Sequence, residues 1–345
     1  MLSLESERWS LTLSLALFFL STAVIGLVGW KLTQLVDRLA DRTGIGEALA
    51  GAVFLGASTS LPGIVTSMTT AWGGHAEFAV SHALGGIAIQ TAFLAIADMT
   101  YRHANLEHAA ASSANLMNGV LLMSMLSLIL LAIVGPEFSL WNVHPVTPCV
   151  VGIYLFGLRL VHHSHVEPLW SPKLTPHTKP DEPETGNRHE NLPKLLMAFT
   201  ASAVLIGTAG WVLARSAVSL VTHTGLSETL VGGVFTTMST SMPELITSLA
   251  AVRRGALTLA VGGIIGGNTF DTLLVAFSDF AFQDGSIYHA TTNQQVYLIA
   301  LTMLMNGILL LGLLRREEHG IANIGFESFC ILLVYLGGIT ILFLT

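Results

Sequence analysis

Charged residues are scarce in this chain of 345 residues. They make up 11% of the sequence, whereas a soluble globular domain carries about 25%. A water-soluble class is therefore excluded. The hydrophobic share of 52% and the mean hydropathy of +0.67 indicate a polytopic membrane protein surrounded by the lipid bilayer. The net charge of −7 argues against nucleic acid as a partner.

Cysteine is equally rare, with Cys149 and Cys330 as the two examples. Both lie in apolar segments without metal or disulfide spacing, so we interpret them as packing residues. Signatures of catalysis are missing too. There is no Ser-His-Asp order, no metal-ligating His-Glu spacing and no phosphate loop. We therefore expect neither an enzyme nor a cofactor.

Ten apolar runs are long enough to cross about 30 Å of hydrocarbon as helices. They predict an all-α integral membrane protein with ten transmembrane helices. The first run, Ser10–Trp30, lacks a cleavage site and predicts a retained span rather than a signal peptide. The hydrophilic segment His163–Asn191 predicts a solvated linker of low structure. The predicted spans are 11–36, 44–71, 76–98, 110–134, 145–162, 193–221, 226–252, 256–280, 292–314 and 321–344.

The distribution of lysine and arginine predicts the orientation in the membrane. With the N-terminus outside, Arg8 and Arg215 lie on the outer side and the other basic residues lie in inner loops. This bias predicts that both termini are extracytoplasmic and that the central loop is cytoplasmic. Short loops and the lack of a large regulatory domain favour a bacterial inner membrane.

The two halves of the sequence repeat each other. Shifting the chain by 181 residues aligns Ser21–Asp98 with Ser202–Asp279 without a gap, and 28 of the 78 pairs are identical. Five helices in each half make the second copy enter the membrane from the opposite side. Such inverted repeats place a binding site near the midplane and are typical of secondary transporters. The predicted divisions are 1–162, with a repeat motif at 44–98, the linker 163–192, and 193–345, with its motif at 225–279.

Two polar segments interrupt the apolar second half. Thr237–Ser248 contains several hydroxyls, Pro243 and Glu244, and Val261–Asp271 is rich in glycine and ends in amide and acid. Within hydrocarbon such groups must face a cavity, each other or an ion. The proline frees backbone carbonyls, and the oxygens together suit a hard cation. The alternative is a kinked helix whose hydroxyls bond its own carbonyls, with Glu244 paired to an arginine.

Both segments resemble the α-repeats of the sodium/calcium exchanger family, within the cation/calcium antiporter superfamily. The resemblance rests on Gly56-Ala-Ser-Thr-Ser-Leu-Pro62, Ser239-Thr-Ser-Met-Pro-Glu-Leu-Ile-Thr-Ser248 and Gly262-Gly-Ile-Ile-Gly-Gly-Asn-Thr-Phe-Asp271. It extends over nearly the whole chain, because the family also has five plus five helices and a central cytoplasmic loop. It implies a secondary antiporter whose partners are inorganic cations.

By this resemblance, one central cation site is lined by the Ser/Thr-Pro-Glu helix and the Gly-rich helix of each half. Glu244 would be the main cation or proton ligand, and Asn268 would share a metal ion with it. Pro62 and Pro243 would break the helices. The other implied cation-binding residues are Thr240, Ser241, Asp271, Ser58, Thr59 and Ser60.

The first repeat departs from the family pattern, which suggests a degenerate half-site in a divergent prokaryotic-type member. Two of the expected acidic or amide ligands are absent, whereas the hydroxyls and the proline remain. The departures are Gly63 in place of the glutamate, Ile87 in place of the amide or acid, Gln90 opposite Asp271, and His82 in the position of Gly263.

A site with so few acids suits a proton or sodium ion better than calcium, which takes six to eight oxygens and binds tightly with more than one carboxylate. We therefore expect exchange of Na⁺ or H⁺ against Ca²⁺ or another cation at reduced stoichiometry, with Glu244 alternately holding a proton or a metal ion. Weaker calcium exchange is the second interpretation. His82 is a candidate proton-coupling group or a structural donor that fills the space left by Gly63.

Other polar and small residues have simpler interpretations. Glu228 near a helix start favours capping, with a place at an ion entrance as the alternative, and its counterpart Glu47 has the same interpretation. Asp98 and Asp279 are expected to face water at helix ends. Glycines on the first helix of each half, Gly26, Gly29, Gly207 and Gly210, would permit sliding or simply close packing.

A second functional class also fits these departures. Because Gly63 and Ile87 remove expected ligands, the chain could be a non-transporting family member that acts as a sensor, scaffold or leak pathway. Against this stand Glu244, Asn268 and the hydroxyls of the second repeat, together with the repeat symmetry. The sequence therefore favours an antiporter.

Overall fold

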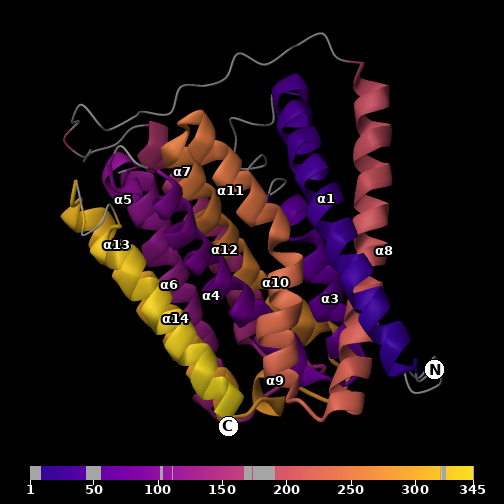
Figure 1. Ribbon diagram of the computed structural model, residues 1–345. Coiled ribbons are helices and arrows are strands. Elements are labelled where there is room, and N and C mark those ends of the chain that lie inside the picture. Colours follow the sequence, from indigo (N-terminus) through magenta and orange to yellow (C-terminus); the bar gives the residue numbers. More distant parts are fainter. Residues whose placement is uncertain are drawn as a thin grey trace.

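The computed structural model is a bundle of tilted helices without a sheet in the described part of the chain (Figure 1). It describes residues 9–43, 56–101, 104–110, 112–166, 173, 191–318, 320 and 324–344. The helices are α1 (Leu11–Thr43), α3 (Leu61–Trp72), α4 (Ala76–Thr100), α5 (Leu106–Ala109), α6 (Ser113–Val134), α7 (Val146–Val166), α8 (Leu192–Thr224), α9 (Glu228–Leu230), η2 (Val231–Thr236), α10 (Thr237–Thr240), α11 (Met242–Arg254), α12 (Leu257–Ala281), η3 (Ile287–Ala290), α13 (Asn293–Arg315) and α14 (Phe326–Leu344).

The predicted spans agree closely with these helices. Eight of the described helices are long and apolar enough to cross a membrane. The other two predicted spans, 44–71 and 226–252, are the proline-containing ones. The described part of the first is helical at 56–59 and again in α3, and its beginning, with Glu47, lies outside the described residues. The second is divided into α9, η2, α10 and α11.

Helices α4 and α12 form the centre of the bundle. In α4, 94% of the most apolar window is buried, and in α12 the share is 72%, whereas α1 and α8 bury 28% each. The two central helices pack against each other and against α3 and α11. Because they occupy equivalent positions in the sequence repeat, the two halves meet at the centre of the molecule.

The long helices α1 and α8 lie side by side at one edge of the bundle (Figure 1). Each also packs on the broken helix of the opposite half, α1 on α11 and α8 on α3. Hydroxyl groups connect α1 to α8 and to the core. Ser14 of α1 bonds Ser219 of α8, and Thr22 of α1 bonds Ser239 of α10, both at 2.8 Å. The pair α1–α8 therefore contacts both proline breaks.

The helix breaks follow from local chemistry. Pro62 and Pro243 each stand in the first turn of a new helix, α3 and α11, where a missing backbone N–H costs nothing. Upstream of the second break, Val231–Thr236 forms a π-helix, a rare form that is frequently found at functional sites. The hydroxyl-bearing residues Ser60, Thr240 and Ser241 at these breaks are buried.

The expectation that Asp98 and Asp279 face water is wrong, because both side chains are 0% exposed. Each carboxylate accepts hydrogen bonds from a following short helix and from a distant loop. Asp98 accepts from the backbone of Leu106 at 2.7 Å and of Gly325 at 3.1 Å. Asp279 accepts from Ile287 and His144, both at 2.9 Å. Folded-back loops thus replace the water expected at these helix ends.

Candidate functional site

A small cavity lies where α3, α4, α10, α11 and α12 meet. Its volume of about 10 Å³ has room for a single water-sized species. Both halves of the chain contribute to it, and its polar groups are carboxylate, hydroxyl, amide and imidazole. The lining residues are Ser60, Gly63, His82, Ala83, Gly86, Gln90, Thr240, Ser241, Glu244, Asp271 and Leu274.

Glu244 supplies an unpartnered acidic group in this cavity. It lies in the first turn of α11, one residue after Pro243, and is 8% exposed. Its Oε2 atom is buried without a hydrogen-bond partner among the described residues. The positive end of the helix dipole favours a carboxylate here. A buried oxygen without a donor is poised to bind a proton or a cation.

Asp271 of α12 is the second acid, and it is anchored to the opposite half. Its Oδ1 accepts a hydrogen bond from Ser60 at 2.5 Å, and its Oδ2 accepts from the Gln90 amide at 2.7 Å. The same amide lies 3.3 Å from the Ser241 hydroxyl. Asp271 therefore connects α4 and the residues preceding α3 to α12, whereas Glu244 has an unpartnered oxygen.

His82 of α4 is fixed between two hydroxyls. Its Nδ1 lies 2.8 Å from the Ser67 hydroxyl, and its Nε2 lies 3.0 Å from the Thr240 hydroxyl. The imidazole is 2% exposed. It lies beside Gly63, where an added Cβ would stand 3.7 Å from the His82 Cε1 and 3.1 Å from a Leu274 methyl group. The ring thus occupies the space into which a side chain at position 63 would extend.

Not all of the residues expected at the site line the cavity. Asn268 lies one turn away on α12, where its amide donates to Thr91 at 3.0 Å and its buried Oδ1 has no partner among the described residues. Ser58 and Thr59 also lie outside the lining, and the Thr59 hydroxyl donates to the Gly56 carbonyl. Ser60, Thr240, Ser241, Glu244, Asp271 and His82 are brought together.

Two contributors were not identified as ligands from the sequence. Gln90 bonds Asp271, and Ser67 bonds His82. Because Gln90 aligns with Asp271 in the sequence repeat, its place at the site could have been predicted from the symmetry. In the described part of the chain, no group of three or more His, Cys, Asp or Glu side chains is placed to hold a metal ion. The cavity thus combines two carboxyl groups with neutral hydroxyl and amide oxygens.

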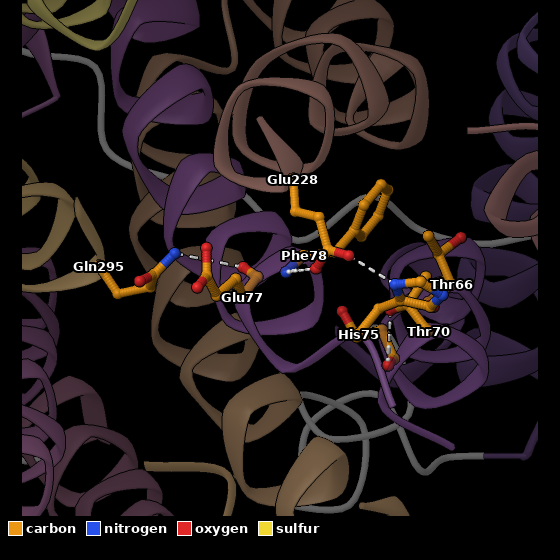
Figure 2. Close-up of polar contacts among 8 residues, drawn as sticks. Thr66, Thr70, His75, Glu77, Phe78, Glu228 and Gln295 are labelled. Carbon is orange, nitrogen blue, oxygen red and sulfur yellow. Dashed lines mark hydrogen bonds and ion pairs between the residues drawn. The ribbon is translucent and has the colours of Figure 1, made fainter. Parts of the chain in front are cut away.

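Glu228 lies at the N-terminal end of α4 (Figure 2) and does not line the cavity. Its Oε1 lies 2.5 Å from the His75 Nδ1, and its Oε2 accepts from the Phe78 backbone at 3.2 Å. Glu228 therefore caps the N-terminus of α4 from the other half of the chain, whereas the capping interpretation placed it at the start of its own helix, where Ser227 accepts from the Leu230 backbone instead. Gln295 of α13 reaches the same helix end through the Glu77 carbonyl at 3.4 Å.

Fold and site together define a helical membrane protein with a buried acidic centre between its two halves. The family model for the sodium/calcium exchanger protein matches residues 13–161 and 194–344. The chain therefore belongs to the sodium/calcium exchanger family. It is a membrane-embedded member of a cation/calcium antiporter family, and this family is not one of enzymes.

Individual relatives agree with this assignment. The chain is 28% identical over 294 residues to a protein of Alkalimonas amylolytica that bears the antiporter name CaxA, covering 81% of this chain and 85% of that protein. It is 32% identical over 88 residues to the inner membrane protein YrbG of Escherichia coli, covering 26% of this chain and 27% of that protein.

Two solved structures have the same fold. The crystal structure of the H⁺/Ca²⁺ exchanger CAX has a TM-score of 0.70 at 13% identity, covering 95% of this chain and 84% of that one. The sodium-calcium exchanger NCX_Mj, soaked with Na⁺ and Sr²⁺, has a TM-score of 0.61 at 17% identity, covering 96% and 99%. This likeness establishes the exchanger fold that the family resemblance implied.

Proposed function

We propose that the protein is a secondary cation antiporter that exchanges Na⁺ or H⁺ against Ca²⁺ or another cation by alternating access at the Glu244 cavity. One observation carries this proposal: Glu244 presents a buried oxygen without a donor, in a cavity built by both halves. A proton or a metal ion would satisfy that oxygen. Competition between the two for one group couples their movements in opposite directions.

The composition of the cavity supports a low stoichiometry. It contains two carboxyl groups, and Asp271 already accepts two hydrogen bonds. The imidazole of His82 stands beside Gly63, in the half where the family pattern has a glutamate. Calcium prefers six to eight oxygens and several charges. The site therefore suits one proton or one monovalent cation at a time, with Glu244 as the group that binds each in turn.

Transport by purified protein in sealed liposomes tests the proposal. The vesicles contain a calcium indicator or a pH indicator, and sodium or calcium gradients are imposed in turn. We expect cation-driven proton movement that Glu244→Gln abolishes and that the exposed control Glu137→Gln retains.

Three other outcomes of the liposome assay would each lead to a different conclusion. Unchanged flux in Glu244→Gln would remove this residue from the mechanism. Calcium entry driven by outward sodium, without proton movement, would agree with antiport but contradict the reduced stoichiometry and the role of Glu244 as a proton carrier. No flux from demonstrably folded protein would favour the non-transporting sensor or scaffold alternative.

We also propose an orientation with both chain ends outside the cytoplasm and the segment 163–192 inside, in a bacterial inner membrane. The halves 1–162 and 193–345 would then act as inverted repeats. A single cysteine at Ser10 or at Lys173, with Cys149 and Cys330 replaced by serine, tests this in intact cells. An impermeant thiol reagent should label position 10 and not position 173. The reverse pattern would invert the orientation.

A further inference from the structure

A second cluster of acids lies far from the central cavity, around the short helix α5. Figure 1 shows α5 at the end of the bundle opposite to the start of α1 and the end of α14. Glu107 of α5 is 1% exposed and Glu327, in the first turn of α14, is 0% exposed. Asp98 of α4 lies close to both. Burial of so many acids needs a specific explanation.

Comparison of the two repeats shows which of these three acids has a counterpart in the other half. Asp98 has an exact counterpart in Asp279, and both cap a short helix and a loop in the same way. Glu107 corresponds to Tyr288, and Glu327 corresponds to Val146, when the chain is shifted by 181 residues. The cap at the other end of the molecule therefore forms without either glutamate. Glu107 and Glu327 are additions in one half.

Apart from the backbone beside each glutamate, the described residues offer the two carboxyl groups no donor. All four of their side-chain oxygens are buried. Their carboxyl groups nevertheless lie within hydrogen-bonding reach of each other. Two ionised carboxylates cannot form this bond, because each is only an acceptor. A single proton would turn one group into a donor to the other.

The side chain of Glu327 is confined in this position. A Cβ at Gly312 of α13 would stand 2.5 Å from the Glu327 Cγ, so glycine makes the room for it. Gly325 leaves similar room beside the Glu327 carboxylate. The side chain therefore cannot relieve repulsion by a small movement toward α13, and it stays directed at Glu107.

The charged groups that the structure describes around the pair have other partners. His108 on α5 bonds the Arg316 carbonyl at 2.7 Å, and the Arg316 guanidinium donates to the Lys173 and His108 carbonyls. Glu317 is paired with Arg315 at 3.3 Å. Helix α12 also packs against α5, but its charged residues Asp271 and Asp279 belong to the central cavity and to the opposite cap. Asp98 adds a further negative charge beside the pair.

We propose that Glu107 and Glu327 form a proton-binding site, in which one shared proton joins α5 to the start of α14. The predicted orientation assigns this end to the cytoplasm, so the site would respond to cytoplasmic pH. Loss of the proton places two negative charges side by side in a buried position and weakens the docking of α5. This site is independent of the proposed exchange at Glu244.

The direction of its pH effect follows from burial. Burial, followed by the charges of Asp98 and Glu327, raises the pKa of Glu107 well above its usual range. The folded protein then binds more protons than the unfolded chain between the ordinary and the raised pKa, so stability falls as pH rises through that window. The amide in Glu107→Gln donates to Glu327 at every pH and should remove this dependence.

Two measurements on the purified full-length protein test the site. In infrared spectra, the difference between wild type and Glu107→Gln should contain one protonated carboxyl band at neutral pH that disappears on alkalinisation. The thermal midpoint of the wild type should fall by about 2 °C for each pH unit over the titration. Glu107→Gln should lose this slope, whereas Glu137→Gln, at an exposed carboxylate, should retain it.

Glu327→Gln keeps the test decisive if Glu107→Gln folds poorly, because it places the amide on the other partner. It should remove the same band and the same slope. Absence of a protonated carboxyl band from both difference spectra would overturn the proposal, and so would an unchanged slope in a folded variant. Neither measurement depends on transport, so failure here and failure of the antiport proposal are distinguishable.

Discussion

Gly29 of α1 lies so close to Pro243 of α11 that a Cβ at position 29 would stand 2.3 Å from the proline Cγ. The other half repeats the relationship, because a Cβ at Gly210 of α8 would stand 2.9 Å from the Pro62 carbonyl oxygen. Each glycine therefore permits a long edge helix to touch the helix break beside the cavity. Movement of α1 or α8 along these contacts would displace the adjoining proline, and Glu244 directly follows Pro243.

Gly29→Ala is expected to impair exchange more than folding. The new methyl group would push α1 away from Pro243, because real Cβ contacts do not occur at 2.3 Å. We expect at least a tenfold loss of liposome transport rate, equivalent to about 1.4 kcal/mol in the barrier. Gly26→Ala is a matched control on the same helix, where the added Cβ would be 3.6 Å from Met242. Equal rates in both variants would show that the contact does not govern exchange.

Restoring the missing acid tests why the first half departs from the family pattern. Gly63→Glu alone should be poorly tolerated, because the new side chain meets Leu274 and the His82 ring. Combined with His82→Gly, it should place a third carboxylate at the cavity and strengthen calcium binding, which grows with ligand charge. Isothermal titration with Ca²⁺ measures this gain. The His82→Gly single variant is the control, and a double variant that binds no better would show that the missing acid does not limit affinity.

The bond from Ser60 to Asp271 should contribute measurably to stability. Ser60→Ala leaves a buried carboxylate oxygen without its donor, which costs about 1–3 kcal/mol. We expect a lower unfolding midpoint in mild detergent. Thr208→Ala, which removes an exposed hydroxyl bonded within its own helix, should have little effect. A Ser60 variant as stable as the wild type would indicate that another donor replaces the hydroxyl.

The sequence repeat was sufficient to anticipate most of this architecture, because proline, glycine and apolar length are local signals. The resemblance to the exchanger family also assigned Ser60, Glu244 and Asp271 to one site. It did not define which oxygens face the cavity: Asn268 lies one turn from Asp271, yet its amide bonds Thr91. Helical spacing alone does not distinguish these neighbouring faces. The burial of Asp98 was missed because its partners lie outside the predicted span: Leu106 begins the short helix α5, and Gly325 comes from a loop distant in sequence.

His144 provides a pH test at the opposite end of the molecule from Glu107. It precedes α7, is 7% exposed, and its Nδ1 accepts from the Val146 backbone at 3.1 Å. Burial, followed by the neighbouring His289, lowers the pKa of His144, while Asp279 opposes the shift. The folded state therefore keeps this imidazole neutral where the unfolded chain would bind a proton.

Stability should consequently fall as pH drops below about 6.5, the ordinary histidine value. This is the opposite direction to the effect expected for Glu107, so the two contributions separate on one thermal titration. His144→Gln should flatten the acidic limb and leave the alkaline limb unchanged. His162→Gln, at an exposed position, should alter neither. If the acidic limb persists in His144→Gln, protonation of another buried group must cause it.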